Sequence, residues 1–103
     1  MRILLIEDNE LVARVLKLVL KQYKVKHHWS PLNTEILVDW SDLIVCDWRI
    51  PCYTEKEMTK FVNKHKHKLI VHSGFDPKIK GVTWVSKGQM YENLLPAIET
   101  WKK

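Results

Sequence analysis

Five polar side chains stand at or near the ends of short apolar runs in the sequence: Glu7, Asp8, Asp47, Ser73 and Lys87. Three carboxylates that lie together repel one another unless a cation joins them. Their oxygens suit Mg²⁺, which binds few carboxylates and fills its other positions with water and phosphate oxygens. A hydroxyl and an ammonium group beside such a site could both contact a phosphoryl group. The residue types therefore predict phosphoryl chemistry on or beside a carboxylate.

Short apolar runs alternate with helical patterns along the whole sequence. The apolar runs predict strands over 2–6, 25–29, 43–46, 69–71 and 82–85, and the spacing of apolar residues predicts helices over 9–23, 31–40, 54–67 and 89–102. Thr54 followed by Glu57 has the spacing of a capping box at the start of the third helix. Continuous apolar strands joined by helices are typical of a parallel sheet that is covered on both faces.

This alternation predicts a doubly wound, flavodoxin-like α/β domain with the strand order 2-1-3-4-5. The predicted strand at 25–29 carries Lys26, His27 and His28, which favours a position at the edge of the sheet. In an open sheet of this class, ligands bind at the carboxyl ends of the strands. We therefore expect the five polar side chains to converge at that edge.

Two places depart from the regular pattern. Only residues 74–81 separate the fourth and fifth predicted strands, whereas a parallel crossover needs about 10–12 residues including its helix. We therefore expect the fourth helix to be absent or reduced to a turn. Pro96 falls inside the last helical stretch, where an interior proline would cost roughly 3 kcal/mol. The regular helix is therefore expected to begin near Asn93, which places Pro96 in its first turn.

Length and composition describe one compact domain over residues 1–103, with 46% hydrophobic and 28% charged residues. No apolar run is long enough to span a membrane, and Glu7 and Asp8 interrupt the first apolar stretch, which argues against a secretory signal. Cys46 and Cys52 are too few for a disulfide framework and lack the spacing of a zinc site. We expect a reduced, cytoplasmic protein without membrane contact.

Positive charge is concentrated in residues 56–68 of a chain whose net charge is +5. Five lysines lie there with a single acid, Glu57; they are Lys56, Lys60, Lys64, Lys66 and Lys68. The stretch predicts either a solvated helix face or a surface that meets a phosphate backbone or an acidic partner. We favour the solvated face, and a nucleic-acid partner is the alternative.

Four motifs in the expected order resemble the receiver domain of two-component response regulators. They are Ile-Leu-Leu-Ile-Glu-Asp-Asn-Glu at 3–10, Asp-Leu-Ile-Val-Cys-Asp-Trp-Arg-Ile-Pro at 42–51, Val-His-Ser-Gly at 71–74 and Trp-Val-Ser-Lys at 84–87. Each motif alone is weak, but together they extend over nearly the whole chain. The sequence thus resembles a receiver in a shortened, single-domain form.

The resemblance implies that Asp47 is a phosphoacceptor. It would take a phosphoryl group from a phosphohistidine, on a histidine kinase or a phosphotransfer protein, or from a small phosphodonor. Glu7, Asp8 and Asp47 would hold Mg²⁺ together with the backbone carbonyl of Arg49. The protein would catalyse only its own phosphoryl transfer and loss, and would act as a switch more than as an enzyme.

The resemblance also implies how the switch is read. Ser73 would hydrogen-bond a phosphoryl oxygen and Lys87 would pair with it. Trp84, three residues before Lys87, takes the place of the family's switch aromatic, which is usually Tyr or Phe. Because no effector domain follows Lys103, the chain is similar to single-domain regulators that signal by contact with a protein effector.

Two departures from the family pattern affect the output. Gly88 stands where the family usually has a proline after the lysine, so the cis peptide usual there is not assumed. The short crossover at 74–81 removes the normal fourth helix. The surface of the fourth helix, fifth strand and fifth helix transmits activation in the family, and here it must be rebuilt or missing.

Other interpretations of the same residues stay open. Glu7 and Asp8 could serve only as acids at the start of the first helix, and Trp84 could be a core residue. Trp48, beside Asp47, is expected to be a lid or a packing residue. The alternative function is a phosphorylation-independent, receiver-like module that binds a protein or nucleic-acid partner. A Mg²⁺-dependent phosphohydrolase is disfavoured, because such enzymes typically place a second acid where Arg49 stands.

Overall fold

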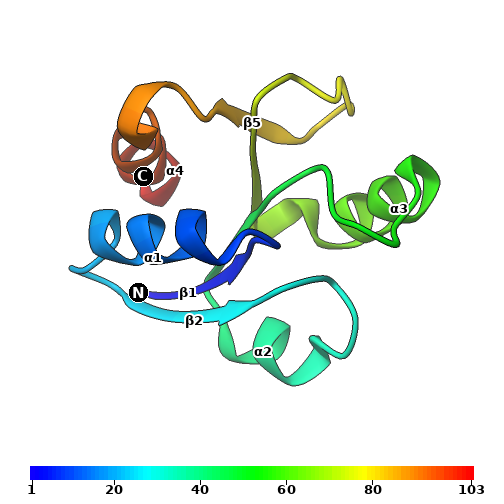
Figure 1. Ribbon diagram of the computed structural model, residues 1–103, viewed down its shortest axis with the longest axis horizontal. Coiled ribbons are helices and arrows are strands. Elements are labelled where there is room, and N and C mark those ends of the chain that lie inside the picture. The colour runs from blue at the N-terminus through cyan, green and yellow to red at the C-terminus, as the bar shows by residue number, and fades with distance from the viewer.

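One parallel sheet of five strands, in the order β2-β1-β3-β4-β5, forms the centre of the computed structural model, which describes all residues 1–103 (Figure 1). The strands are β1 (Arg2–Ile6), β2 (Lys24–His28), β3 (Leu43–Cys46), β4 (Leu69–Ser73) and β5 (Thr83–Ser86). All four neighbouring pairs are parallel. The predicted flavodoxin-like sheet and its strand order are confirmed, and β2 lies at an edge as its polar sequence predicted.

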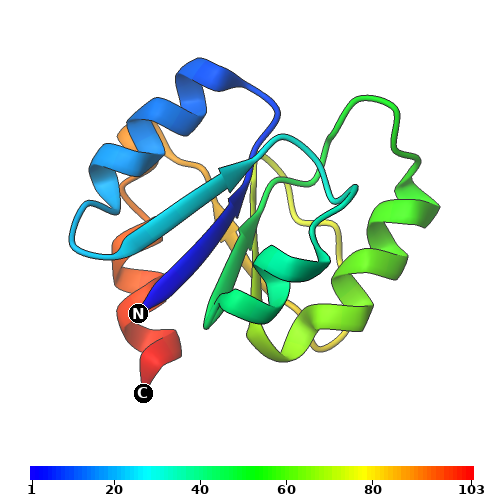
Figure 2. The ribbon, with the colours of Figure 1, turned by 90° about the horizontal axis from the view of Figure 1, so that it is seen from below.

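Four α-helices cover both faces of this sheet (Figures 1 and 2). They are α1 (Glu10–Val19), α2 (Glu35–Trp40), α3 (Glu55–His65) and α4 (Leu94–Lys102). Leu16 of α1 and Ile98 of α4 belong to the core cluster on one face, and Met58 of α3 belongs to the cluster on the other. Successive residues of a strand alternate between the clusters, because strand side chains point to opposite faces. None of the helices combines the length and the apolar character that crossing a membrane requires.

Side-chain caps explain where two of the helices begin. The Asn9 side chain accepts hydrogen bonds from the backbone N–H groups of Leu11 and Val12 at 3.0 and 3.1 Å, so α1 begins after Asn9. Thr54 and Glu57 form the predicted capping box of α3. Such caps satisfy backbone donors that have no partner within the helix.

The helix predicted over 31–40 is shorter than expected, because α2 begins only at Glu35. Asn33 has a φ of 58°, in the left-handed region that an α-helix does not use. The Thr34 hydroxyl donates to the carbonyl oxygen of Pro31 at 2.6 Å. Local hydrogen bonds of this kind compete with helix formation, so residues 31–34 form a turn.

Residues 74–82 contain no helix, which confirms that the fourth helix of the regular pattern is lost. A turn closed by Val82 N donating to Ile79 O, at 3.2 Å, replaces it. Ile79 and Val82 are partly buried and pack against the core cluster that includes Val38 of α2 and Met58 of α3, here called the α2–α3 core. The short segment thus covers with two side chains the place where a helix would lie.

The C-terminal stretch divides into a 3₁₀ turn at Gln89–Tyr91 and the helix α4. The N-cap of α4 is Asn93, and Ala97 N donates to Asn93 O at 3.3 Å. Pro96 therefore lies in the first turn, as predicted, where its missing N–H leaves no hydrogen bond unmade. All peptide bonds are trans, including the one before Gly88.

Candidate functional site

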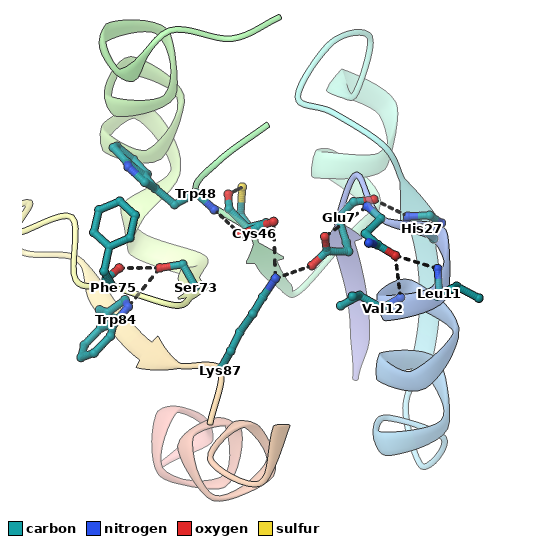
Figure 3. A network of polar contacts seen from close by, with 12 residues as sticks. Glu7, Leu11, Val12, His27, Cys46, Trp48, Ser73, Phe75, Trp84 and Lys87 are labelled. Carbon is teal, nitrogen blue, oxygen red and sulfur yellow. Dashed lines mark hydrogen bonds and ion pairs between the residues drawn. The ribbon is translucent and has the colours of Figure 1, made fainter. Parts of the chain in front are cut away.

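Backbone pairing continues past the ends of the strands and fixes the residues that follow. Asp47 N donates to Ile6 O at 2.9 Å, and Lys87 N donates to Ser73 O at 3.0 Å. Glu7 directly follows β1, and β1 lies beside β3 in the sheet. The side chains of Glu7, Asp47 and Lys87 therefore meet at the carboxyl edge of the sheet, as the sequence predicted. Figure 3 shows Lys87 extending toward Glu7 there.

Lys87 joins the two carboxylates. Its Nζ lies 2.9 Å from Glu7 Oε1 and 3.4 Å from Asp47 Oδ2. The side chains of Glu7, Asp47 and Lys87 are 2%, 11% and 23% exposed, so one ammonium group is shared by two largely buried acids. The second oxygen of Asp47, Oδ1, accepts a hydrogen bond from Trp48 N at 2.7 Å. These contacts hold Asp47 in a defined orientation.

Asp8 completes an acidic cluster with the other two carboxylates. One carboxylate oxygen from each of Glu7, Asp8 and Asp47 lies within 4.8 Å of the others. Three carboxylates at this spacing, with Asp8 only partly buried, form an all-oxygen donor set that suits Mg²⁺ with water at its remaining positions. The donor set thus fits the metal that the sequence predicted, and the part of the Arg49 carbonyl in it stays a prediction.

Burial and the neighbouring charges change how the two acids ionise. Burial, and then the charge of Asp47, raises the pKa of Glu7 to about 7, although Lys87 opposes the shift. Burial also raises the pKa of Asp47, again against the effect of Lys87. For Lys87, burial alone would lower the pKa, but the hydrogen bond to Glu7 and the charge of Asp47 outweigh it and raise the pKa. Three carboxylates stand against one lysine here, and this charge balance favours a cation.

The Ser73 hydroxyl makes its hydrogen bonds away from the carboxylates. It donates to the carbonyl oxygen of Phe75 at 2.6 Å and accepts from Nε1 of Trp84 at 3.1 Å (Figure 3). Ser73 is 2% exposed and Trp84 is partly buried, so these bonds are shielded from water. The structure thus brings the predicted switch residues Ser73 and Trp84 into direct contact with each other.

Arg49 contributes a side-chain contact that the sequence did not suggest. Its guanidinium carbon lies 4.6 Å from the centre of the Phe75 ring. A pocket of about 430 Å³ opens beside the acids, and its lining includes Asp8, Arg49, Trp48 and Tyr53. Sequence analysis missed Phe75, whose only signal is a large apolar side chain in a segment without strand or helix periodicity.

Other predicted positions have structural places. Trp48 is 4% exposed and belongs to the α2–α3 core, which confirms its packing role, and Cys46 is fully buried in β3. Lys68, one of the five clustered lysines, is engaged, because its Nζ donates to the carbonyl oxygens of Val38 and Ser41 at 2.6 and 2.8 Å. The other four lysines of the stretch are exposed.

Solved structures with the same fold include receiver domains. The receiver domain of the hybrid histidine kinase CckA is 21% identical to the chain, with a TM-score of 0.76 and 100% of both chains covered. The response regulator TrrA of Thermotoga maritima, solved in complex with Mg²⁺ and BeF, is 19% identical, with a TM-score of 0.74 and 97% of each chain covered. The chemotaxis protein CheY4 of Vibrio cholerae is 16% identical, with a TM-score of 0.76 and 96% of each covered.

No family model and no curated protein matches the sequence. At identities of 16–21%, the structural matches establish the fold. The chain therefore has the receiver fold over nearly its whole length, and its resemblance to receiver domains is confirmed at that level.

Proposed function

We propose that the protein is a response-regulator receiver that accepts a phosphoryl group on Asp47. The observation that carries this proposal is the shared contact of Lys87 with Glu7 and Asp47, with Asp8 completing the acidic cluster. A lone structural ion pair would not join two acids to one lysine, with a third acid beside them, at the carboxyl edge of the sheet, where ligands bind in this fold class. The receiver fold agrees with this function.

In the proposed reaction, a carboxylate oxygen of Asp47 attacks the phosphorus atom of a phosphohistidine. A P–O bond forms and the P–N bond breaks, and the electron pair leaves with the imidazole nitrogen, which takes up a proton. Attack by water later breaks the acyl phosphate and returns the free carboxylate. No outside substrate is turned over, so the protein acts as a switch and not as a conventional enzyme.

Glu7, Asp8 and Asp47 would hold Mg²⁺, with the Arg49 carbonyl as a further ligand. When bound, the ion supplies positive charge that offsets the charge of the transferring phosphoryl group. Lys87 would pair with a phosphoryl oxygen once a metal takes over the neutralisation of Glu7. Ser73 would donate a hydrogen bond to another phosphoryl oxygen. The Trp84 side chain, which donates to the Ser73 hydroxyl, would move together with Ser73.

The proposed partners are a histidine kinase or phosphotransfer protein as the phosphodonor, and a protein effector that recognises the phosphorylated surface. We place this exchange in the cytoplasm. The output would come from the region of Ser73, Trp84 and residues 74–82, because the Ser73 hydroxyl must leave Phe75 before it can reach a phosphoryl group.

Phosphorylation is tested by incubating the protein with Mg²⁺ and a small phosphodonor, followed by intact-mass measurement. The wild type should gain one phosphoryl group, and Asp47→Asn should gain none. Asp39→Asn, at an exposed position on α2, is the matched control and should label like the wild type. Labelling of Asp47→Asn would refute the assignment.

Coupling is tested by tryptophan fluorescence, because Trp48 and Trp84 both lie at the site. Mg²⁺ should give a saturable change, and beryllofluoride, an analogue of the phosphoryl group, should give a further change that Asp47→Asn lacks. Lys87→Ala should bind Mg²⁺ but lose the beryllofluoride response. A Mg²⁺ response alone in the wild type would mean that the acids bind metal without a working switch.

A phosphorylation-independent binding module is the second candidate. It is favoured by the loss of the helix between β4 and β5, which alters the region next to the switch residues. In this case a partner would bind the wild type and Asp47→Asn equally well. A nucleic-acid partner at the exposed lysines Lys56, Lys60, Lys64 and Lys66 would show a steep loss of affinity as salt rises, and a protein partner a shallow one.

A further inference from the structure

The Ser73 hydroxyl has a single proton, and that proton is committed. It is donated to the carbonyl oxygen of Phe75 at 2.6 Å, while Trp84 Nε1 donates to the same hydroxyl at 3.1 Å. A hydroxyl donates only one hydrogen bond at a time. Ser73 therefore cannot donate to a group on Asp47 until its bond to Phe75 breaks. Whatever holds Phe75 in place also keeps Ser73 in its resting position.

No helix or strand holds the backbone of Phe75. Gly74 before it has open space around the position of a side chain, and the segment 74–82 has no helix. Phe75 is itself 37% exposed. Its ring contacts the Arg49 guanidinium, which comes from the loop after β3 and lies 4.6 Å from the ring centre. A cation over an aromatic face is attracted to it, more strongly as water is excluded.

We propose that Arg49, stacked on Phe75, is a positioning residue that holds the Ser73 hydroxyl in its resting hydrogen bond and so sets how readily Ser73 turns toward a group on Asp47. The second half of this proposal rests on the proposed function of Asp47. The first half concerns the resting protein alone. Arg49 thereby has a role for its side chain that is separate from the role of its backbone carbonyl.

Arg49 and Phe75 lie in two different loops, so their contact connects these loops. Arg49 is two residues from Asp47, and Phe75 is two residues from Ser73. The stacked pair therefore links the loop that carries the acid to the segment that carries the hydroxyl. Weakening the pair should free Ser73 without altering Glu7, Asp47 or Lys87, none of which contacts either ring or guanidinium in the contacts described above.

The resting half is tested on the protein without ligands, by hydrogen exchange of the Trp84 indole N–H measured by NMR. The resonance is assigned with Trp84→Phe. Phe75→Leu keeps an apolar side chain and the backbone carbonyl but removes the aromatic face, so exchange should quicken about two- to fivefold. Phe75→Tyr keeps the face and is the matched control, with exchange as in the wild type.

A double-variant cycle isolates the part of Arg49. Arg49→Met should quicken the exchange as Phe75→Leu does, and the two changes together should add nothing further, because either one removes the same contact. Unchanged exchange in Phe75→Leu would overturn the proposal. Equal quickening in Phe75→Leu and Phe75→Tyr, or full additivity in the cycle, would also overturn it, because the ring would then act without Arg49.

The second half is tested by titration with beryllofluoride at saturating Mg²⁺. Phe75→Leu should lower the half-saturating concentration about two- to fivefold relative to the wild type and Phe75→Tyr, while the Mg²⁺ titration stays the same. An unchanged beryllofluoride affinity would overturn this half. If the wild type does not bind beryllofluoride, the proposed function of Asp47 fails, and the indole exchange still decides whether Arg49 positions Ser73.

Discussion

The carboxyl edge of the sheet has an acidic half, at the ends of β1 and β3, and a switch half, at the ends of β4 and β5. In the acidic half, Glu7 and Asp47 follow strands that are buried at all but one position. In the switch half, β4 is buried at every position, but only one residue of β5 is buried and no helix joins β4 to β5. Ser73 is oriented there by side-chain contacts with Trp84 and by the carbonyl of Phe75.

The two halves are therefore held by different kinds of interaction. The acids are placed by the strand register, which can change only if the sheet itself changes. In the switch half, the strand register places the backbone of Ser73 in the same way. The orientation of its hydroxyl and the segment after it depend on a few hydrogen bonds, a cation–aromatic contact and turns, which open at lower free energy than a core strand. The proposed phosphoacceptor needs fixed geometry and the proposed switch needs two accessible states, and the division agrees with that proposal.

The largest expected difference between the halves is in the free energy of unfolding lost when an apolar side chain is shortened. Ile44 is fully buried in β3, and Ile44→Ala should lower the free energy of unfolding by about 2–5 kcal/mol, because it leaves a cavity. Ile79 is partly buried in the segment 74–82, and Ile79→Ala should lower the free energy of unfolding by about 1 kcal/mol, since water can fill the space. Urea unfolding measures both, and equal losses would contradict the comparison.

Removing the shared lysine should have the next largest effect. Lys87→Met leaves the buried Glu7 and Asp47 without their cation, and breaking a buried ion pair costs about 3–5 kcal/mol. We expect a smaller loss of about 2–3 kcal/mol at neutral pH, because Lys87 is 23% exposed and Glu7 can take up a proton. Added Mg²⁺ should stabilise the variant. Urea unfolding with and without Mg²⁺ tests both expectations, and a variant as stable as the wild type would mean that the lysine does not stabilise the acids.

His72 gives the switch half a dependence on pH. It is 1% exposed, its two ring nitrogens have no hydrogen-bond partner, and its ring meets that of Tyr91 edge to face. Burial, and then the charge of Lys87, lowers the pKa of His72 to about 4. Between pH 6.5 and 4 the unfolded chain therefore binds a proton that the folded chain does not, and stability falls as the pH falls through this window.

Replacing this side chain by Phe should remove the effect. The stability of the wild type should fall relative to His72→Phe by about 2 kcal/mol between pH 7 and pH 5. Comparison with the variant is needed because Glu7, whose pKa is raised, has the opposite effect between about pH 4.5 and 7 and is present in both proteins. Thermal unfolding at a series of pH values makes the measurement, and parallel curves would show that His72 does not titrate as described.

The acidic half could be predicted from the sequence because its determinants are local. An apolar run followed by Glu7 and Asp8, and another followed by Asp47, places acids at strand ends, and the parallel sheet brings those ends together. The position of Lys87 beside these acids was predictable by the same rule, because Lys87 follows the end of the fifth strand. The loss of the fourth helix was also predictable, because the length of the connection, residues 74–81, is read directly from the sequence.

The switch half could not be predicted in the same way. Its contacts join residues through turns whose geometry depends on tertiary packing, as in the stacking of Arg49 on Phe75. The start of α2 was misplaced for a related reason, because local hydrogen bonds of Thr34 and the left-handed Asn33 outweighed the helical pattern. Apolar periodicity reports buried faces and carries no information on such loops.

The smallest predicted effect concerns the backbone of the switch half. Gly88, directly after Lys87, has a φ of 52°, and a Cβ there would lie 2.8 Å from Asn93 Nδ2. Gly88→Ala should therefore destabilise the protein by about 1–2 kcal/mol. Gly74→Ala is the matched control, since Gly74 has an ordinary φ and nothing within 4 Å of a Cβ, and it should be neutral or slightly stabilising. Urea unfolding of both variants distinguishes them. Equal stabilities would mean that the segment after Lys87 adjusts freely, and that the switch half is held by side chains alone.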